Sequence, residues 1–419
     1  MTHHYRACVD SLRMAGRQIV IVNEPSAIKH VMATHHDIYE RKSPQMRRAL
    51  EYLLGDGLFI SDGETWKRRR PLVADIVHKN RLPVFAPTME TVASAFAERW
   101  AMRASAETFD GLAEMAELTA EIIARTVFGS ELGAQAARDV ISGFTQYQRH
   151  VDSFNLGYFL GSDEGWPIWR SRGLRQGAAQ VQKVIEAVVE RHLAGAGDEG
   201  SMIQLLVRRR EKNPELGLDV QALRNEAATI FMAGHETTAS LLTWCWYCLA
   251  NAPWAEAALH RELDSVLEGR APRVDDVASL PYARAVIEET LRLYPPVPIL
   301  SRQAGRADRL AHIDVEKGAL VLVIPWLLHR ASDLWEKPNH FMPERFLAAA
   351  RPKPYSYVPF AIGPRICAGL TFGMTESILC LATLAQRFRV RLAPQAQVEP
   401  VCRLTLRPKA GLSIRVEPR

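Results

Sequence analysis

The sequence predicts a mainly α-helical protein with a small β portion. Long segments with apolar residues at three-and-four spacing dominate the chain, and strand-like stretches are few and short. The expected strands do not alternate regularly with helices, which argues against a doubly wound α/β sheet. No internal repeat or low-complexity linker interrupts the pattern, so a single domain over residues 1–419 is the simplest organisation.

The elements can be placed in chain order from these patterns. Helical periodicity predicts helices over Met89–Phe128, Gly177–Ala194, Asp219–Ala250, Trp254–Leu267, Tyr282–Tyr294 and Thr371–Phe388. Two near-continuous apolar runs predict strands at Gln18–Val22 and Ala319–Ile324, and alternating patterns predict two more at Arg389–Leu392 and Leu412–Val416. We therefore expect a large helical body with a small sheet portion.

The segment Asp219–Ala250 predicts an unusually long helix. At ~1.5 Å per residue it would run roughly 45 to 50 Å, and it is apolar nearly all round, which is typical of a helix at the centre of a large domain. Asp219 is a plausible N-cap. Gly234 and Glu236 lie in the middle of this helix, where a glycine and a buried carboxylate both lower its stability. We therefore expect these residues to have a role that offsets that cost.

Composition limits the class of protein and its partners. The 419 residues are 47% hydrophobic and 24% charged, which excludes a disordered tail, a collagen or a small disulfide scaffold. The net charge of +5 is too small to indicate a nucleic-acid groove. Six scattered cysteines and the lack of a signal-peptide pattern predict a soluble, cytoplasmic protein, and no apolar run reaches the ~18 residues of a membrane span.

The most informative segment for function is the loop before the last predicted helix. Its residues are Phe360, Gly363, Arg365, Cys367 and Gly369. A thiol at a helix N-terminus is favoured as a thiolate, which binds metals or attacks electrophiles, while the glycines permit close approach to a bulky group. A buried structural cysteine is the ordinary alternative for a lone Cys, but that alternative must also explain the Phe, the two Gly and the Arg at set offsets.

The pattern Phe-x-x-Gly-x-Arg-x-Cys-x-Gly resembles the haem-binding loop of the cytochrome P-450 superfamily. Further segments are similar to that family in the same order, from about Gln18 onward, so the chain is identified as a soluble, bacterial-type member. The resemblance implies a b-type haem with the Cys367 thiolate as iron ligand, below a long central helix. Thiolate ligation favours cleavage of an O–O bond at haem iron.

The resemblance also implies roles for residues outside the loop. Glu236 and Thr237 match the oxygen-activation motif and would relay protons, with Gly234 leaving room for dioxygen at a helix distortion. Glu289, Arg292 and Arg345 match the family's structural ion-pair cluster. Trp66, Arg70, Arg302 and Arg365 would hold the two haem propionates, and Phe360, Gly363 and Gly369 would shape the haem loop. The expected apolar substrate pocket consists of Ile230, Phe231, Ala233, Val297, Ile299 and Leu300.

These features predict an O2-dependent monooxygenase that hydroxylates a hydrophobic small molecule. The chain ends soon after Cys367, so we expect no fused reductase domain and an external ferredoxin or flavodoxin with its reductase, docking on Lys67, Arg68 and Arg69. A peroxide-driven peroxygenase and a non-catalytic haem protein that senses gas remain as alternatives. Family members usually carry a longer segment before Gln18, so the first helix and part of the small sheet are expected to be missing.

Overall fold

The computed structural model describes residues 5–14, 16–103, 107–129, 134–151, 172–347, 352–394 and 396–419. Most of these residues are helical. The helices are α1 (Pro25–Lys29), α2 (Pro44–Leu54), α3 (Gly63–Ile76), α4 (Leu82–Ala101), α5 (Gly111–Phe128), α6 (Ala134–Val151), α8 (Arg172–Leu193), α9 (Met202–Lys212), α10 (Val220–Ala250), α11 (Pro253–Leu267), α12 (Pro281–Leu293), α13 (Pro325–Leu328) and α14 (Leu370–Ala385).

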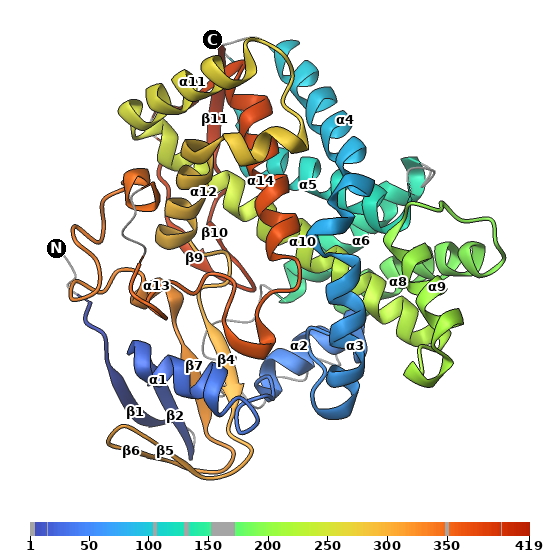
Figure 1. Ribbon diagram of the computed structural model, residues 1–419, viewed down its shortest axis with the longest axis vertical. Coiled ribbons are helices and arrows are strands. Elements are labelled where there is room, and N and C mark those ends of the chain that lie inside the picture. The colour runs from blue at the N-terminus through green and yellow to red at the C-terminus, as the bar shows by residue number, and fades with distance from the viewer. Residues whose placement is uncertain are drawn as a thin grey trace.

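Helix α10 organises the helical body. It runs through the middle of the molecule and packs against α5, α8, α12 and α14 (Figure 1). The predicted cap is present, because the Asp219 side chain accepts from the backbone N–H of Ala222 at 2.7 Å. The helix is buried along most of its length, as its all-round apolar composition predicts.

The strands form small sheets rather than one large one. A four-stranded sheet has the order β1 (Val9–Met14), β2 (Arg17–Val22), β7 (Leu320–Val323) and β4 (Leu300–Gln303), and it lies at one edge of the molecule (Figure 1). A second sheet joins β3 (Phe109–Asp110), β11 (Ser413–Pro418) and β8 (Phe388–Leu392). Two hairpins complete the set, β5 (Asp308–Leu310) with β6 (Ile313–Val315) and β9 (Pro400–Cys402) with β10 (Leu406–Pro408).

The prediction of one helix over Met89–Phe128 is wrong. The structure has two helices there, α4 and α5, and between them β3 pairs with the chain's last strand, β11. The Asp110 carboxylate accepts from the N–H of Leu112, which caps α5, and from the N–H of Leu412. Pairing with a strand some 300 residues away overrides the local helical pattern. The periodicity of a short segment cannot predict such a distant partner.

The other expected elements are present within a few residues. Part of the small sheet is expected to be missing, yet β1 lies on the outer edge of the four-stranded sheet and pairs with β2. Patterns for α2, α3, α6 and α9 were not recognised in the sequence. Among the helices of the described ranges, none combines the length and the hydropathy that a transmembrane span needs.

Candidate functional site

The loop before α14 is built around close backbone contacts. The Cys367 N–H donates to the carbonyl of Phe360 at 2.9 Å, which folds the loop back on itself. Gly363 has a φ of +71°, and a Cβ at this position would lie 2.0 Å from the Met32 carbonyl oxygen. Only glycine can combine that conformation with that contact. Helix α14 then begins at Leu370, with Gly369 as its N-cap.

Cys367 is exposed to solvent, although surrounding protein atoms partly desolvate its thiol. Desolvation raises the pKa of the thiol, while a hydrogen bond from the Gly369 N–H and the positive charges of Arg70 and Lys42 act in the opposite direction. The groups that oppose desolvation are those that stabilise a thiolate. This is the environment expected of a metal-binding cysteine at a helix N-terminus.

A cluster of cations lies on one side of this thiol: Arg70 and Lys42 act on Cys367, and Arg302 and Arg365 act on Lys42. The Arg365 guanidinium lies 4.3 Å from the centroid of the Trp66 ring, and its Nη1 donates to the Ser61 carbonyl at 2.8 Å. Burial lowers the pKa of Arg365 to about 10, and burial together with the charge of Arg365 lowers the pKa of Arg302 to about 10. Burial also lowers the pKa of Arg70, and the nearby Cys367 thiolate opposes that shift.

Lys42 belongs to the same cluster and was missed by sequence reasoning. Its ammonium lies 4.5 Å from the centroid of the Phe59 ring. Burial lowers its pKa well below the ordinary value, and the charges of Arg302 and Arg365 act in the same direction. A single lysine just before a helix carries no motif, so only the fold shows that it joins this cluster.

The cluster is suited to an anionic group. Arg365 makes an ion pair only at the outer limit, 4.0 Å from Glu40, and its buried Nε has no hydrogen-bond partner among the described residues. Buried cations that repel one another are unfavourable unless an anion joins them. The two carboxylates of a haem would supply that charge, so these residues fit a haem better than a neutral ligand.

Open space next to the loop supports the same assignment. A Cβ added at Gly369 or at Gly373 of α14 would meet no atom of the described residues within 4 Å. On α10, Ala233 is exposed and Thr237 is partly exposed, although most of the surrounding helix is buried. A flat apolar group bound at the thiol would contact such surfaces.

The expected role of Gly234 is not supported. A Cβ at residue 234 would lie 2.7 Å from Cδ1 of Ile123 on α5, and α10 continues as a helix through this position. The glycine therefore allows close packing between α10 and α5, and it does not open a gap in the helix for dioxygen. This packing offsets the cost of a glycine inside the helix.

The acid and alcohol of the α10 motif are both hydrogen-bonded. Thr237 Oγ1 donates to the Ala233 carbonyl one turn earlier at 2.6 Å. The Glu236 carboxylate, 7% exposed, accepts from the Thr405 hydroxyl at 2.5 Å. Thr405 lies in the turn between β9 and β10, and no sequence signal pointed to it.

The predicted ion-pair cluster is formed. Arg292 donates to both carboxylate oxygens of Glu289, at 2.6 and 2.7 Å, and both side chains are fully buried. Arg345 Nε lies 3.4 Å from the same carboxylate. The remaining N–H groups of Arg292 donate to backbone carbonyls of the segment that leads to the thiol loop, so the cluster is structural.

The six expected pocket residues do not lie together. The Phe231 ring packs against Phe128, Phe144 and His235 inside the helical body. Ile299 packs with Ile19, Leu320 and Leu322 on one face of the four-stranded sheet, whereas Val297 and Leu300 pack on the other face. These placements argue against Phe231 and Ile299 as pocket residues. Ile230 is 7% exposed, and Ala233 is the most accessible of the six.

The three cations expected to bind a redox partner lie in different environments. Lys67 and Arg68 are exposed on α3, and Lys67 pairs with Glu64 at 2.9 Å. Arg69 is 8% exposed and is bound to Asp56 and Glu226, so the expectation that it binds a partner is wrong.

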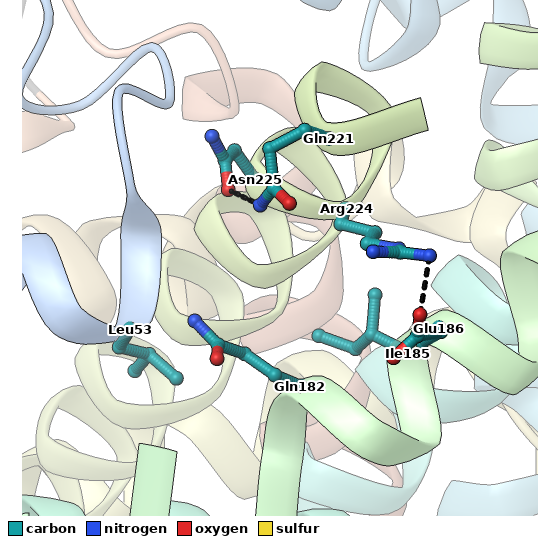
Figure 2. Close-up of a pocket in the computed structure, with 7 residues that line it drawn as sticks. All are labelled: Leu53, Gln182, Ile185, Glu186, Gln221, Arg224 and Asn225. Atoms are coloured by element: carbon teal, nitrogen blue, oxygen red, sulfur yellow. Dashed lines mark hydrogen bonds and ion pairs between the residues drawn. The ribbon is translucent and has the colours of Figure 1, made fainter. Parts of the chain in front are cut away.

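A small cleft with a volume of about 70 Å³ lies between α2, α8 and α10 (Figure 2). Its lining residues are Leu53, Gln182, Ile185, Glu186, Gln221, Arg224 and Asn225. Several of its polar groups pair with one another, as in the Arg224–Glu186 ion pair at 2.6 Å and the Gln221–Asn225 hydrogen bond at 2.9 Å. Along α10 it lies about 12 Å or more from Ala233. We therefore do not assign it to the site.

A cysteine thiol beside a cation cluster, at the start of α14, together with the acid and alcohol of α10, which packs against α14, defines a candidate site of the haem-thiolate class. The family model for cytochrome P450 matches residues 5–415. The chain belongs to the cytochrome P450 family. It is a cytochrome P450 monooxygenase, and its cofactor is haem b.

Individual relatives agree with this assignment. The chain is 32% identical to cyclooctatin synthase of Streptomyces melanosporofaciens, over 94% of this chain and 85% of that protein. It is 29% identical to a cytokinin hydroxylase of Arabidopsis thaliana, over 95% of this chain and 78% of that protein. The crystal structure of the cytochrome P450DA heme domain matches with a TM-score of 0.86 at 23% identity, covering 98% of this chain and 90% of that one. The last comparison confirms the predicted fold.

Proposed function

We propose that this monooxygenase inserts one oxygen atom of O2 into a hydrophobic small molecule, with electrons from a separate ferredoxin or flavodoxin. The observation that carries the proposal is the thiol loop with its cation cluster, at the start of a helix, α14, that packs against α10 with its acid–alcohol pair. Ala233 is an exposed apolar residue of α10, and charged side chains are absent from the expected pocket set. A relative at 29% identity is a carotene epsilon-monooxygenase, which also supports an apolar substrate.

Each residue of the site has a proposed role. Cys367 ligates the haem iron, and Trp66, Arg70, Arg302, Arg365 and Lys42 hold the propionates. The bound haem supplies the centre at which O2 is reduced and cleaved. Glu236 and Thr237 hold and move protons on the α10 side: the Thr237 proton is directed at the Ala233 carbonyl, so its oxygen can accept from a water.

The electron donor is proposed to be an acidic protein that binds near α3. Lys67 and Arg68 are exposed on the helix that also carries Trp66 and Arg70, and complementary charge mainly increases the association rate. Reversing both charges should slow reduction at low salt and flatten its salt dependence. Unchanged reduction kinetics with both ferredoxin and flavodoxin donors would remove this docking site.

A peroxide-driven peroxygenase is the second candidate function. It needs no proton relay, and the presence of both Glu236 and Thr237 argues against it. Substituting Thr237→Ala distinguishes the two: a monooxygenase should consume reductant and release peroxide. Unimpaired coupling of reductant to product would contradict the relay.

The first experiment is the difference spectrum of the reduced, carbon monoxide-bound protein, recorded beside Cys367→Ala. A strongly red-shifted Soret band that the variant lacks would support Cys367 as the thiolate ligand. An unchanged band in the variant would show that another residue is the ligand. Because Cys367→Ala can also lose haem, the haem content of both proteins is measured in the same samples.

A further inference from the structure

Three side chains of α10 face the β9–β10 hairpin along one stripe. Glu236, Ser240 and Trp244 follow one another at four-residue spacing, which places them on the same side of the helix. Ser240 Oγ and Trp244 Nε1 both donate to the carbonyl of Leu406, the latter at 2.9 Å. Glu236 accepts from the hydroxyl of the preceding residue, Thr405.

The same stretch of the hairpin is also fixed from the opposite side. The Leu406 N–H donates to the Pro296 carbonyl at 2.9 Å, in the segment that follows α12. Thr405 is 3% exposed. With the backbone of Leu406 bound on both sides, the Thr405 hydroxyl has little freedom, so its position determines where the Glu236 carboxyl group can lie.

We propose that Thr405 is a positioning residue for proton delivery, holding the Glu236 carboxyl group through its hydroxyl. The inference rests on the proposed role of Glu236. A glutamate side chain has several rotatable bonds, and a carboxylate that loses a donor in a buried place reorients toward another one. Without the hydroxyl, Glu236 would spend less time in the orientation that serves the relay, although its place on α10 is unchanged.

The test uses the full haem-loaded chain with Thr405→Val, Thr405→Ser and Glu236→Gln, and the double variant T405V/E236Q. The first readout is the infrared C–O stretching band of the reduced, carbon monoxide-bound protein, which reports the local field without turnover. The second is the rate of reductant oxidation in H2O and D2O, with a surrogate ferredoxin and its reductase and no added substrate.

We expect T405V to shift or broaden the C–O band in the same direction as E236Q. It should also slow proton-dependent reductant oxidation by about three- to tenfold and increase the solvent isotope effect, since acid–base groups contribute more than this when lost outright. Thr405→Ser keeps the hydroxyl and should stay within about twofold of the parent protein. The double variant should be no worse than E236Q alone, because Thr405 acts through Glu236.

Ser240→Ala is the matched control, because it removes a bond between hairpin and helix without touching Glu236. If S240A reproduces the T405V effects, hairpin loosening is the cause and the inference is overturned. A T405V protein that behaves like the parent while E236Q is impaired overturns the inference but leaves the proposed function standing. An E236Q protein that behaves like the parent refutes the proton role itself. Should T405V fail to take up haem, Thr405→Ala removes the hydroxyl without added bulk and serves the same test.

Discussion

Replacing Arg292 by methionine should nearly abolish the stability of the fold. Arg292 and Glu289 are fully buried, and the guanidinium also donates to the carbonyls of His329, Pro338 and His340 at 2.7, 2.6 and 3.0 Å. Removing it leaves Glu289 with the Met342 N–H at 2.8 Å and Arg345 at 3.4 Å. Leaving a buried charge without its partner costs about 3 to 5 kcal/mol, and each carbonyl that loses its donor adds to this cost.

That cost is comparable with the whole stability of a typical domain, about 5 to 15 kcal/mol. Arg292→Lys keeps the charge but cannot donate both to the two oxygens of Glu289 and to the three carbonyls. This variant should therefore lose an intermediate amount of stability. The assay is urea unfolding at fixed haem concentration, since bound haem adds to apparent stability. Arg284→Met, an exposed arginine on the same helix, is the control and should change stability by no more than about 0.5 kcal/mol. An Arg292→Met protein within about 1 kcal/mol of the parent would refute the reasoning.

Three further predictions follow from the thiol loop and its surroundings. Gly363→Ala should lower thermal stability because its Cβ meets the Met32 carbonyl, whereas Gly369→Ala should fold normally and lose haem affinity, measured by haem transfer to apomyoglobin. Lys42→Met should speed haem transfer in the same assay, by several-fold, through loss of one cation near the propionates. Burial lowers the pKa of His329 to about 3, so its stabilising contribution is present above the unfolded pKa of about 6.5 and falls as pH drops toward 3. In urea unfolding, the parent's free energy of unfolding, taken relative to that of His329→Gln, should fall by roughly 1.4 kcal/mol per pH unit from pH 6 to pH 4.

Sequence reasoning succeeded where the determinants are local. The residues of the thiol loop pattern lie within one short segment, and Glu289 and Arg292 are three residues apart on one helix. It failed where the determinants are distant: Thr405 meets Glu236 across 169 residues, and Lys42 joins the cation cluster through tertiary packing alone. Gly234 was recognised as costly, but its partner Ile123 lies on another helix, so its role could not be read from α10.

The basic run on α3 shows how helix geometry divides adjacent charges among different roles. Consecutive residues are about 100° apart around a helix, so Trp66 and Arg70, one turn apart, share the side of the thiol loop, while Lys67 and Arg68 face solvent. Arg69 turns inward and holds Asp56 at 2.8 Å and Glu226 at 3.3 Å. The Glu226 carboxylate also accepts from the Leu58 N–H at 3.0 Å, and burial raises the pKa of Glu226 to about 7 even though Arg69 opposes the shift.

Charge reversal along this run should therefore have two distinct effects. Lys67→Glu and Arg68→Glu should slow reduction by an acidic donor and leave unfolding nearly unchanged, because both side chains are solvated. Arg69→Glu should place a third carboxylate beside Asp56 and Glu226 and cost several kcal/mol of stability. Stopped-flow reduction and urea unfolding of the same three variants separate the effects. Slow reduction without loss of stability in Arg69→Glu would show that this arginine faces the donor after all, contrary to its buried position.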